Sequence, residues 1–210
     1  MMDEVSIHLT RAGKRYNRDW IFRNLVLELP SGSKTALIGP NGSGKSTLLG
    51  VLSSFLSLSE GEIHWKKNGV MLEKEKIFEQ IAICAPYLDI PEMYSATELF
   101  EFHFGLKKKF GSATNQALLE NAGLGTVGNK LIRDYSSGMK QRIKLLLAFY
   151  SDVPVLLLDE PTSNLDASGI NWYNRLLEEL PPHRTLIVAS NLGYEYEICN
   201  QQLKLSDFKN

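Results

Sequence analysis

The sequence predicts an α/β fold with a mostly parallel sheet, and three features of the chain support this prediction. Continuous apolar runs at residues 155–158 and 186–189 are typical of strands that are buried on both faces, as strands of a parallel sheet are. A stretch with helical spacing of apolar residues, around 170–180, separates the two runs. A glycine-rich loop at 39–46 lies between an apolar strand and a helical segment, which is the order that phosphate-binding α/β folds require.

The chain opens with two strands that we expect to pair in antiparallel fashion. Residues 5–9 and 25–29 alternate in part between apolar and polar side chains, as half-exposed strands do, and a Pro-Ser-Gly turn follows the second segment. A short apolar strand at 35–38 then runs into the glycine loop. Leucines and a valine at helical spacing predict a helix at 46–56, directly after the loop.

The middle of the chain is expected to add two strands and a cluster of helices. Strands are predicted at 61–65 and 81–85. Helices are predicted from apolar periodicity at 96–104, 115–121 and 138–150. A last strand is expected at 202–205. Because the 210 residues contain no internal repeat or low-complexity linker, we expect them to form one domain, residues 1–210.

Composition and charge exclude several partners and locations. The 23 basic and 24 acidic side chains give a net charge of -1, so no overall positive field exists to attract nucleic acid or an anionic membrane surface. The longest apolar runs are far shorter than the roughly 20 residues of a membrane-spanning helix. The acidic start, residues 1–5, lacks the basic and apolar segments of a secretory signal, and Cys84 and Cys199 are too few for a disulfide framework. These features predict a cytoplasmic chain.

The glycine loop is the strongest candidate for a ligand site. It matches the pattern G-x-x-x-x-G-K-[ST], in which backbone N–H groups converge on phosphate oxygens and the helix dipole adds positive potential. Lys45 is expected to reach the terminal phosphates of ATP, and the Ser46 hydroxyl is expected to bind Mg²⁺. The predicted nucleotide-binding residues of this segment are Gly39, Pro40, Asn41, Gly42, Ser43, Gly44, Lys45, Ser46 and Thr47.

Two carboxylates follow the buried strand at 155–158. Asp159 and Glu160 would lie at the carboxyl end of a parallel sheet, where open α/β folds bind their ligands. Asp159 is a candidate metal ligand for Mg²⁺, and Glu160 is a candidate to polarise the water that attacks the γ-phosphate. An apolar run ending in Asp-Glu is weak evidence by itself, but together with the glycine loop it predicts an ATPase site.

Two further segments resemble motifs of the ATP-binding cassette (ABC) family. Residues 135–142, Tyr-Ser-Ser-Gly-Met-Lys-Gln-Arg, are similar to the family signature, Leu-Ser-Gly-Gly-Gln followed by x-Gln-Arg. Residues 160–166, Glu-Pro-Thr-Ser-Asn-Leu-Asp, resemble the family's Walker B to D-loop segment. The resemblance implies a P-loop NTPase core with a mostly parallel sheet, an N-terminal antiparallel β lobe and a helical lobe inserted at about 88–150.

The resemblance also implies partners. Ser136 can cap a helix that starts near Gly138, and in the family this helix end contacts the ATP held by the other subunit. A head-to-tail homodimer, or a heterodimer with a second ABC subunit, is therefore implied. A separate transmembrane permease would hold the chain at the inner face of the cell membrane, and Tyr87, Met93 and Tyr94 are candidates to contact it. The Tyr-Ser-x-Gly-Met form of the signature is similar to that of bacterial exporter subunits.

Three positions bear on how the nucleotide is held and cleaved. Tyr16 resembles the aromatic residue that stacks on adenine in this family, with Trp20 as the second choice. Tyr87 stands where the family has a glutamine that contacts Mg²⁺ and the attacking water, and Asn191 stands where it has a histidine that contacts the γ-phosphate. An amide can donate a hydrogen bond but cannot exchange a proton near neutral pH. We therefore expect an ATPase with slow turnover, with Lys45, Glu160 and Asn191 as its catalytic residues.

Two other functions stay open. One is a soluble ABC protein that uses ATP-driven dimerisation without transport, and the other is a nucleotide-gated dimer that does not hydrolyse ATP. Co-purification with a membrane protein and measurement of phosphate release distinguish these functions from an ATP-hydrolysing transporter subunit.

Overall fold

The computed structural model describes residues 3–209 and divides the chain into two compact units. The first unit comprises Met1–Ile83, Pro154–Glu160 and Pro181–Asn210, and the second comprises Cys84–Val153 and Pro161–Leu180. Met1 and Met2, which begin the segment expected to lack a secretory signal, lie outside the described residues. Among residues 3–209, no helix has the length and apolar character that a membrane span requires.

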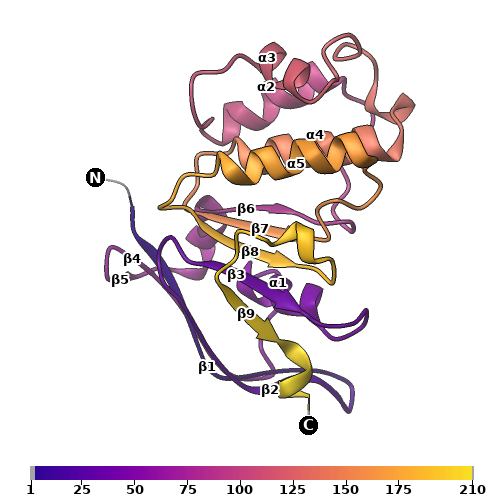
Figure 1. Ribbon diagram of the computed structural model, residues 1–210. Coiled ribbons are helices and arrows are strands. Elements are labelled where there is room, and N and C mark those ends of the chain that lie inside the picture. The colour runs from indigo at the N-terminus through magenta and orange to yellow at the C-terminus, as the bar shows by residue number, and fades with distance from the viewer. Residues whose placement is uncertain (1–2, 210) are drawn as a thin grey trace. The chain divides into compact units, whose positions relative to one another are not determined.

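The first unit is built on a five-stranded sheet with the strand order β6-β7-β8-β3-β9, which can be followed in Figure 1. The strands are β6 (Ile81–Cys84), β7 (Val155–Asp159), β8 (Thr185–Ala189), β3 (Lys34–Ile38) and β9 (Gln201–Lys204). β3 pairs in parallel with β8 and with β9, and β7 pairs in parallel with β8. Every residue of β7 and β8 is buried, which confirms the parallel sheet that the continuous apolar runs predicted.

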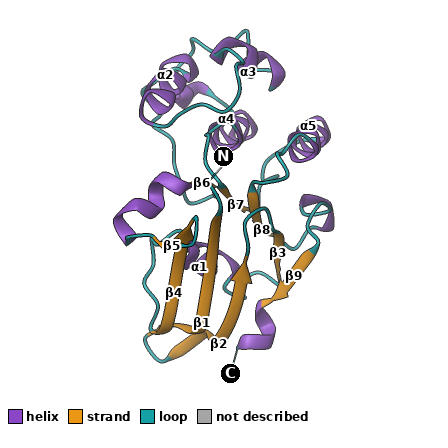
Figure 2. Cartoon of the chain, turned by 90° about the vertical axis from the view of Figure 1, so that its left-hand side faces the viewer, coloured by secondary structure: helices purple, strands orange, loops and turns teal. Residues whose placement is uncertain are grey.

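A second sheet of the same unit has the strand order β2-β1-β4-β5, and Figure 2 shows its longer strands side by side. The strands are β1 (Val5–Tyr16), β2 (Asp19–Leu29), β4 (Glu60–Lys67) and β5 (Val70–Met71). β1 pairs antiparallel with β2 and with β4, as the opening of the sequence predicted. Both β1 and β2 extend beyond the predicted segments, because pairing continues to the hairpin at Tyr16 and Asp19 across register shifts that interrupt the alternation.

The helix α1 (Lys45–Leu52) lies in the core of the first unit. Leu48 and Leu49 of α1 are fully buried in a cluster that draws apolar side chains from both sheets. The prediction that this helix continues to residue 56 was wrong. Ser54 adopts a left-handed φ of 62°, and the N–H of Leu56 donates back to the carbonyl of Gly50 at 2.9 Å, so the chain reverses after Leu52.

The second unit contains four α-helices: α2 (Ala96–Leu106), α3 (Asn115–Asn121), α4 (Ser137–Phe149) and α5 (Ala167–Glu178). Each helix begins after a side chain that accepts a hydrogen bond from a backbone N–H of the first turn, and these capping residues are Ser95, Thr114, Ser136 and Asp166. α4 and α5 lie side by side in Figure 1. The Phe149 ring of α4 meets the Tyr173 ring of α5 edge to face, with centroids 6.2 Å apart. Because Asp166 caps it, α5 starts earlier than its apolar period indicated.

Short 3₁₀ helices, which lack an apolar period, were not predicted. They lie at Lys74–Gln80, Ile132–Asp134, Gly193–Glu195 and Leu205–Phe208. The last of them contains Leu205, which was expected to end the final strand. The third directly follows the loop after β8, which carries Asn191.

Candidate functional site

The glycine loop is shaped by a left-handed residue directly before α1. Gly44 is the N-cap of α1 and has a φ of 103°, a conformation that residues with a side chain disfavour. A Cβ on Gly44 would also lie only 2.3 Å from Cγ2 of Ile21, a residue of β2. Glycine is therefore required at this position for two reasons. Because glycine has no side chain, no side-chain hydrogen bond caps the first turn of α1.

The Lys45 side chain is hydrogen-bonded to backbone carbonyls of its own glycine loop. Its ammonium donates to the carbonyl of Gly39 at 2.7 Å and to that of Pro40 at 3.2 Å, and the residue is 5% exposed. Two neutral carbonyls are weaker partners for an ammonium than charged oxygens are. The arrangement therefore stores a cation next to the first turn of α1, where phosphate oxygens would compete for it. Nearby, the buried hydroxyl of Ser43 makes no hydrogen bond with any described residue.

A cavity of about 310 Å³ opens at the start of α1. This volume is at the lower end of the range for small-molecule sites, roughly 300–1,000 Å³. Its lining residues are Ile21, Asn41, Gly42, Gly44, Lys45, Ser46, Thr47 and Glu160. Most of these were predicted from the glycine loop. Ile21 was missed, because no motif marks a side chain that packs beneath the loop from β2.

Asp159 at the end of β7 is a buried carboxylate. It is 2% exposed, and neither carboxylate oxygen makes a hydrogen bond in proper geometry among the described residues. Burial raises its pKa, and the charges of Glu160 and Glu195 add to the rise, whereas the nearby Ser46 hydroxyl and Lys45 oppose it. Two buried, unsatisfied oxygens beside a serine hydroxyl fit the oxygen-ligand chemistry of Mg²⁺. Ser46 and Asp159 are therefore suited to hold that ion together.

Glu160 has a strained backbone. Its φ of 43° lies in the left-handed region, which is uncommon for a residue with a side chain. The Glu160 N–H donates a backbone hydrogen bond to the carbonyl of Ala189 in β8 at 2.9 Å, and this bond stabilises the conformation. Glu160 lines the cavity together with Ser46, so the residue predicted to act on water lies in the wall of the same space as the residue predicted to bind Mg²⁺.

The loop after β8 approaches the glycine loop through two amides. The side-chain N–H of Asn191 donates to the side-chain oxygen of Asn41 at 3.5 Å, a long hydrogen bond that a better acceptor can replace. Asn191 is exposed and stands beside a residue of the cavity wall. The structure thus places the predicted γ-phosphate contact next to the loop expected to bind phosphates.

The two aromatic candidates for adenine differ in their surroundings. The Trp20 ring lies against two guanidinium groups, those of Arg15 at 5.4 Å and Arg23 at 4.6 Å, and Arg23 is fixed by a 2.8 Å hydrogen bond to Glu60. The Tyr16 ring is 46% exposed and has the Lys14 ammonium at 5.1 Å. Tyr16 is therefore the more accessible stacking surface, although neither ring lines the cavity at α1.

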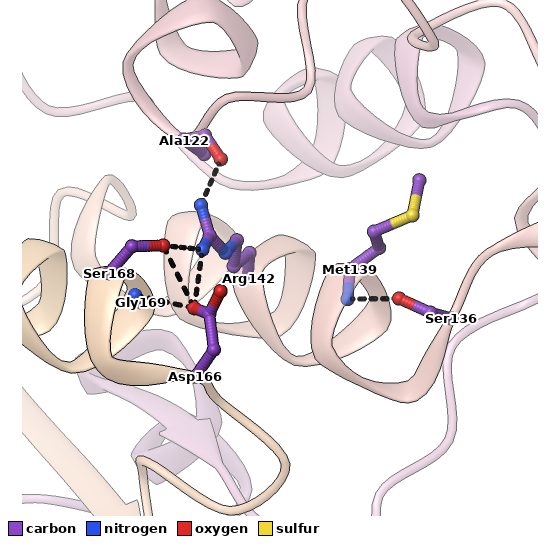
Figure 3. Close-up of polar contacts among 7 residues, drawn as sticks. All are labelled: Ala122, Ser136, Met139, Arg142, Asp166, Ser168 and Gly169. Atoms are coloured by element: carbon purple, nitrogen blue, oxygen red, sulfur yellow. Dashed lines mark hydrogen bonds and ion pairs between the residues drawn. The ribbon is translucent and has the colours of Figure 1, made fainter.

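In the second unit, the segment that resembles the signature forms the first turn of α4. Ser136 caps the helix by accepting a hydrogen bond from the N–H of Met139 at 3.2 Å, as Figure 3 shows. A Cβ on Gly138 would lie 2.8 Å from the carbonyl oxygen of Asn164, so glycine is required where the two segments cross. A pocket of about 400 Å³ lies over this turn. It is lined by Gly123, Leu124, Ser136, Ser137, Gly138, Met139, Arg142, Asn164, Leu165 and Asp166.

Arg142 ties the walls of this signature pocket together (Figure 3). Its guanidinium donates to the Ala122 carbonyl at 2.8 Å, to the Asp166 carboxylate at 3.1 Å and to the Ser168 hydroxyl at 3.0 Å. The Gly169 N–H, then Ser168 and Arg142, lower the pKa of Asp166. Sequence reasoning identified Arg142 and Asp166 only as letters of two motifs, because nothing in either motif shows that the two side chains meet.

The candidate permease contacts are exposed. Tyr87, Met93 and Tyr94 are 51%, 72% and 41% exposed, and the Tyr94 ring stacks on Phe102 with centroids 6.2 Å apart. Phe100, by contrast, is fully buried and meets Phe104 edge to face. Aromatic side chains of the second unit therefore fall into two groups, a buried one that includes Phe100 and an exposed one that includes Tyr87 and Tyr94.

Comparison with known proteins supports the resemblance of this chain to the ABC family. The family model described as ABC transporter matches residues 22–163. The lantibiotic transport ATP-binding protein SrtF of Streptococcus pyogenes is 28% identical over 195 residues, covering 88% of this chain and 79% of the relative. ABC transporter I family member 1 of Arabidopsis thaliana is 33% identical over 189 residues, covering 86% of this chain and 80% of the relative.

Solved structures show the same fold. A putative ABC transporter ATP-binding protein from Pyrococcus furiosus matches with a TM-score of 0.80 at 22% identity, covering 98% of this chain and 100% of that chain. The dimeric bacterial ABC transporter cassette MJ0796 matches with a TM-score of 0.79 at 22% identity, covering 95% and 94%. The family match, the relatives and the shared fold lead to one conclusion. The chain belongs to the ABC transporter family, as an ATP-binding subunit of the nucleotide-binding kind.

Proposed function

We propose that this chain binds and hydrolyses ATP for an ABC transporter and couples ATP-driven dimerisation to a separate membrane permease. The observation that carries the proposal is the cavity at the start of α1. It gathers the uncapped first turn of the helix, the cation Lys45 and the strained carboxylate Glu160 around one space. Binding groups for phosphate and a group that can act on water are therefore neighbours.

Each group has a function in this chemistry. Lys45 would exchange its two carbonyl acceptors for oxygens of the β- and γ-phosphates. Ser46 and Asp159 would hold Mg²⁺, which when bound polarises the phosphate and neutralises developing charge. Glu160 would accept a hydrogen bond from the attacking water and orient it. Asn191 would release Asn41 and donate its amide N–H to the γ-phosphate.

We propose that turnover is slow. Removing one transition-state donor costs about 2.7–4 kcal/mol, or about a hundred- to a thousand-fold in rate, and an amide in place of an imidazole forfeits part of that amount. Asn191 keeps a donor but cannot carry a proton. Tyr87 replaces an amide by a longer, stiffer phenol. These two substitutions affect cleavage and leave the binding groups Lys45 and Ser46 in place.

We propose that two copies, or this chain and a second ABC subunit, associate head to tail. The signature pocket offers the capped first turn of α4 with Ser136 and Gly138, and its walls are pre-formed by Arg142. A helix N-terminus of this kind favours an anion. The match to a dimeric cassette in solved structures supports this arrangement by fold.

We also propose that a transmembrane permease holds the chain at the inner face of the cell membrane. The exposed aromatic and methionine side chains at Tyr87, Met93 and Tyr94 suit a protein contact. Relatives such as the SrtF protein carry transport in their names, which supports a transport role. No nucleic-acid partner is proposed, because the net charge is -1.

Two measurements test the assembly. Glu160→Gln should keep nucleotide binding, so adding MgATP should convert this variant to dimers on size exclusion. Lys45→Ala should elute at the same volume with and without MgATP. Isolation of the tagged chain from its own cells should recover a multi-span membrane protein. Recovery of soluble dimers alone would contradict the transport role and favour a soluble ABC protein.

A second candidate function is a nucleotide-gated dimer without hydrolysis. The observation that favours it is the amide at position 191, which cannot exchange a proton near neutral pH. ATP-dependent dimers of the wild-type chain without any phosphate release would support this second function.

A further inference from the structure

A buried hydroxyl and a buried carboxylate face each other behind the loop that carries Asn191. Ser190 is fully buried at the end of β8, and Glu195 is 1% exposed at the end of the 3₁₀ helix Gly193–Glu195. The Ser190 hydroxyl donates a hydrogen bond to the Glu195 carboxylate. Burying a carboxylate costs free energy unless it is hydrogen-bonded, and the Ser190 hydroxyl supplies such a hydrogen bond here. The pair belongs to none of the motifs described above.

The two residues close a ring of hydrogen bonds around the loop. The Ser190 hydroxyl also accepts from the N–H of Leu192 at 2.9 Å, and the N–H of Glu195 donates to the carbonyl of Leu192 at 3.0 Å. Together with the bond between Ser190 and Glu195, these contacts join both ends of the loop to its middle. The loop therefore has a defined conformation although its surface residues are exposed.

The ring is anchored to the strand that leads into the glycine loop. The backbone N–H of Ser190 donates to the carbonyl of Leu37 in β3 at 3.1 Å. Asn191 stands between the anchored Ser190 and the hydrogen-bonded Leu192, with its amide directed to Asn41. An amide has no charge to draw it to a phosphate from a distance, so its contribution depends on how well its direction is fixed in advance.

From this geometry we propose that Ser190 and Glu195 are positioning residues that direct the amide of Asn191 at the γ-phosphate of ATP. The inference rests on the proposed nucleotide site but not on hydrolysis. Glu195 fixes the hydroxyl, the hydroxyl fixes the turn, and the turn fixes the amide. The pair thereby lets the site distinguish ATP from ADP, since only ATP presents the phosphate that Asn191 reaches.

The test compares dissociation constants for ADP and for a non-hydrolysable ATP analogue with Mg²⁺, measured by calorimetry. Ser190→Ala and Glu195→Ala should each reduce the preference for the analogue about tenfold, which is what a hydrogen bond to a charged group contributes, and ADP binding should change less than about twofold. Glu197→Ala is the matched control, because it removes an exposed carboxylate from the same segment. Its preference should equal that of the wild type.

A double-mutant cycle separates positioning from general stability. In an Asn191→Ala background, which has already lost the amide, adding Ser190→Ala should cause no further loss of preference. Ser190→Thr and Glu195→Gln keep a donor and an acceptor and should stay within about twofold of the wild type, and they give the answer if the alanine variants do not fold.

Three results would overturn the positioning role. They are an equal loss from Ser190→Ala with and without Asn191, parallel weakening of ADP and analogue, and a Glu195→Gln loss as large as that of Glu195→Ala. A wild type that prefers the analogue but releases no phosphate contradicts hydrolysis and leaves the positioning role supported. A wild type without any preference contradicts the positioning role even if ATP is hydrolysed.

Discussion

Single residues of the candidate site keep their chemistry at a cost to the fold. The Asp159 carboxyl is buried with neither oxygen in a hydrogen bond of proper geometry to a described residue, and Glu160 adopts a left-handed backbone. The Lys45 ammonium donates its hydrogen bonds to two neutral backbone carbonyls. Such local conflicts are typical of functional sites. Each has a consequence that can be measured.

The charge of Asp159 is predicted to destabilise the nucleotide-free chain. Burial raises its pKa, so the folded chain binds this proton more readily than the unfolded chain does. Its stabilising contribution is therefore present when the group is protonated and is lost as the pH rises through the folded pKa. Asp159→Asn should raise the Tm at pH 7 by roughly 2–4 °C, corresponding to about 1 kcal/mol.

Thermal melts across pH check this prediction. The Tm difference between Asp159→Asn and the wild type should shrink as the pH falls toward the folded pKa. The further increase in Tm that Mg²⁺ gives the wild type in the presence of ATP should be absent in the variant. A Tm below that of the wild type at every pH would show that the carboxylate is satisfied in the nucleotide-free chain.

Gly44 is predicted to be intolerant of any side chain. Gly44→Ala should destabilise the chain by about 1–3 kcal/mol through its φ alone, and the clash with Ile21 should add to that and weaken ATP binding. Gly69→Ala is the matched control, since Gly69 has a similar φ of 80° but open space around it. Chemical denaturation and nucleotide titration of both variants check this, and equal losses would contradict the role of the Ile21 contact.

Secondary-structure elements differ in how well the sequence predicted them. The strands β7 and β8 were predicted because continuous apolar runs report burial on both faces. Helix ends were predicted less well, since they depend on single residues such as Ser54 with its positive φ and Asp166 with its capping carboxylate. The ring around Asn191 was not predicted, because it includes a 3₁₀ turn that leaves no period in the sequence.

The same reason explains what was missed in the signature pocket. Its glycine and capping serine were readable from a motif, whereas the ion pair between Arg142 and Asp166 depends on how α4 and α5 pack. Contacts between elements are formed by tertiary structure, and a single sequence read by itself carries no direct record of them. The candidate nucleotide-binding residues were easier to predict because most of them lie in a single loop.

Arg142 is predicted to stabilise the helices of the second unit as a set. Arg142→Ala would leave the Ala122 carbonyl and the Asp166 carboxylate without this donor, and we expect a loss of about 1–3 kcal/mol. Arg133→Ala is the control, because its ion pair with the neighbouring Asp134 lies in the open and should contribute little. Chemical denaturation should show a larger loss for Arg142→Ala, and equal losses would contradict the tie between the helices.

The whole molecule combines the cavity at the start of α1 in the first unit with the signature pocket in the second. Sequence, fold and relatives agree that it is an ATP-binding subunit of the ABC transporter family. We propose in addition that the chain hydrolyses ATP slowly, with Glu160 acting on water and the Asn191 amide in place of an imidazole. This claim concerns the complete site and needs a measurement of turnover.

The most direct measurement is steady-state phosphate release with saturating MgATP for the wild type, Glu160→Gln and Lys45→Ala. The account predicts a wild-type rate well below about 1 s⁻¹, at the slow end of enzyme turnover numbers, and at least about tenfold above Glu160→Gln. Lys45→Ala should match the background at all ATP concentrations. A wild-type rate equal to that of Glu160→Gln would contradict the account.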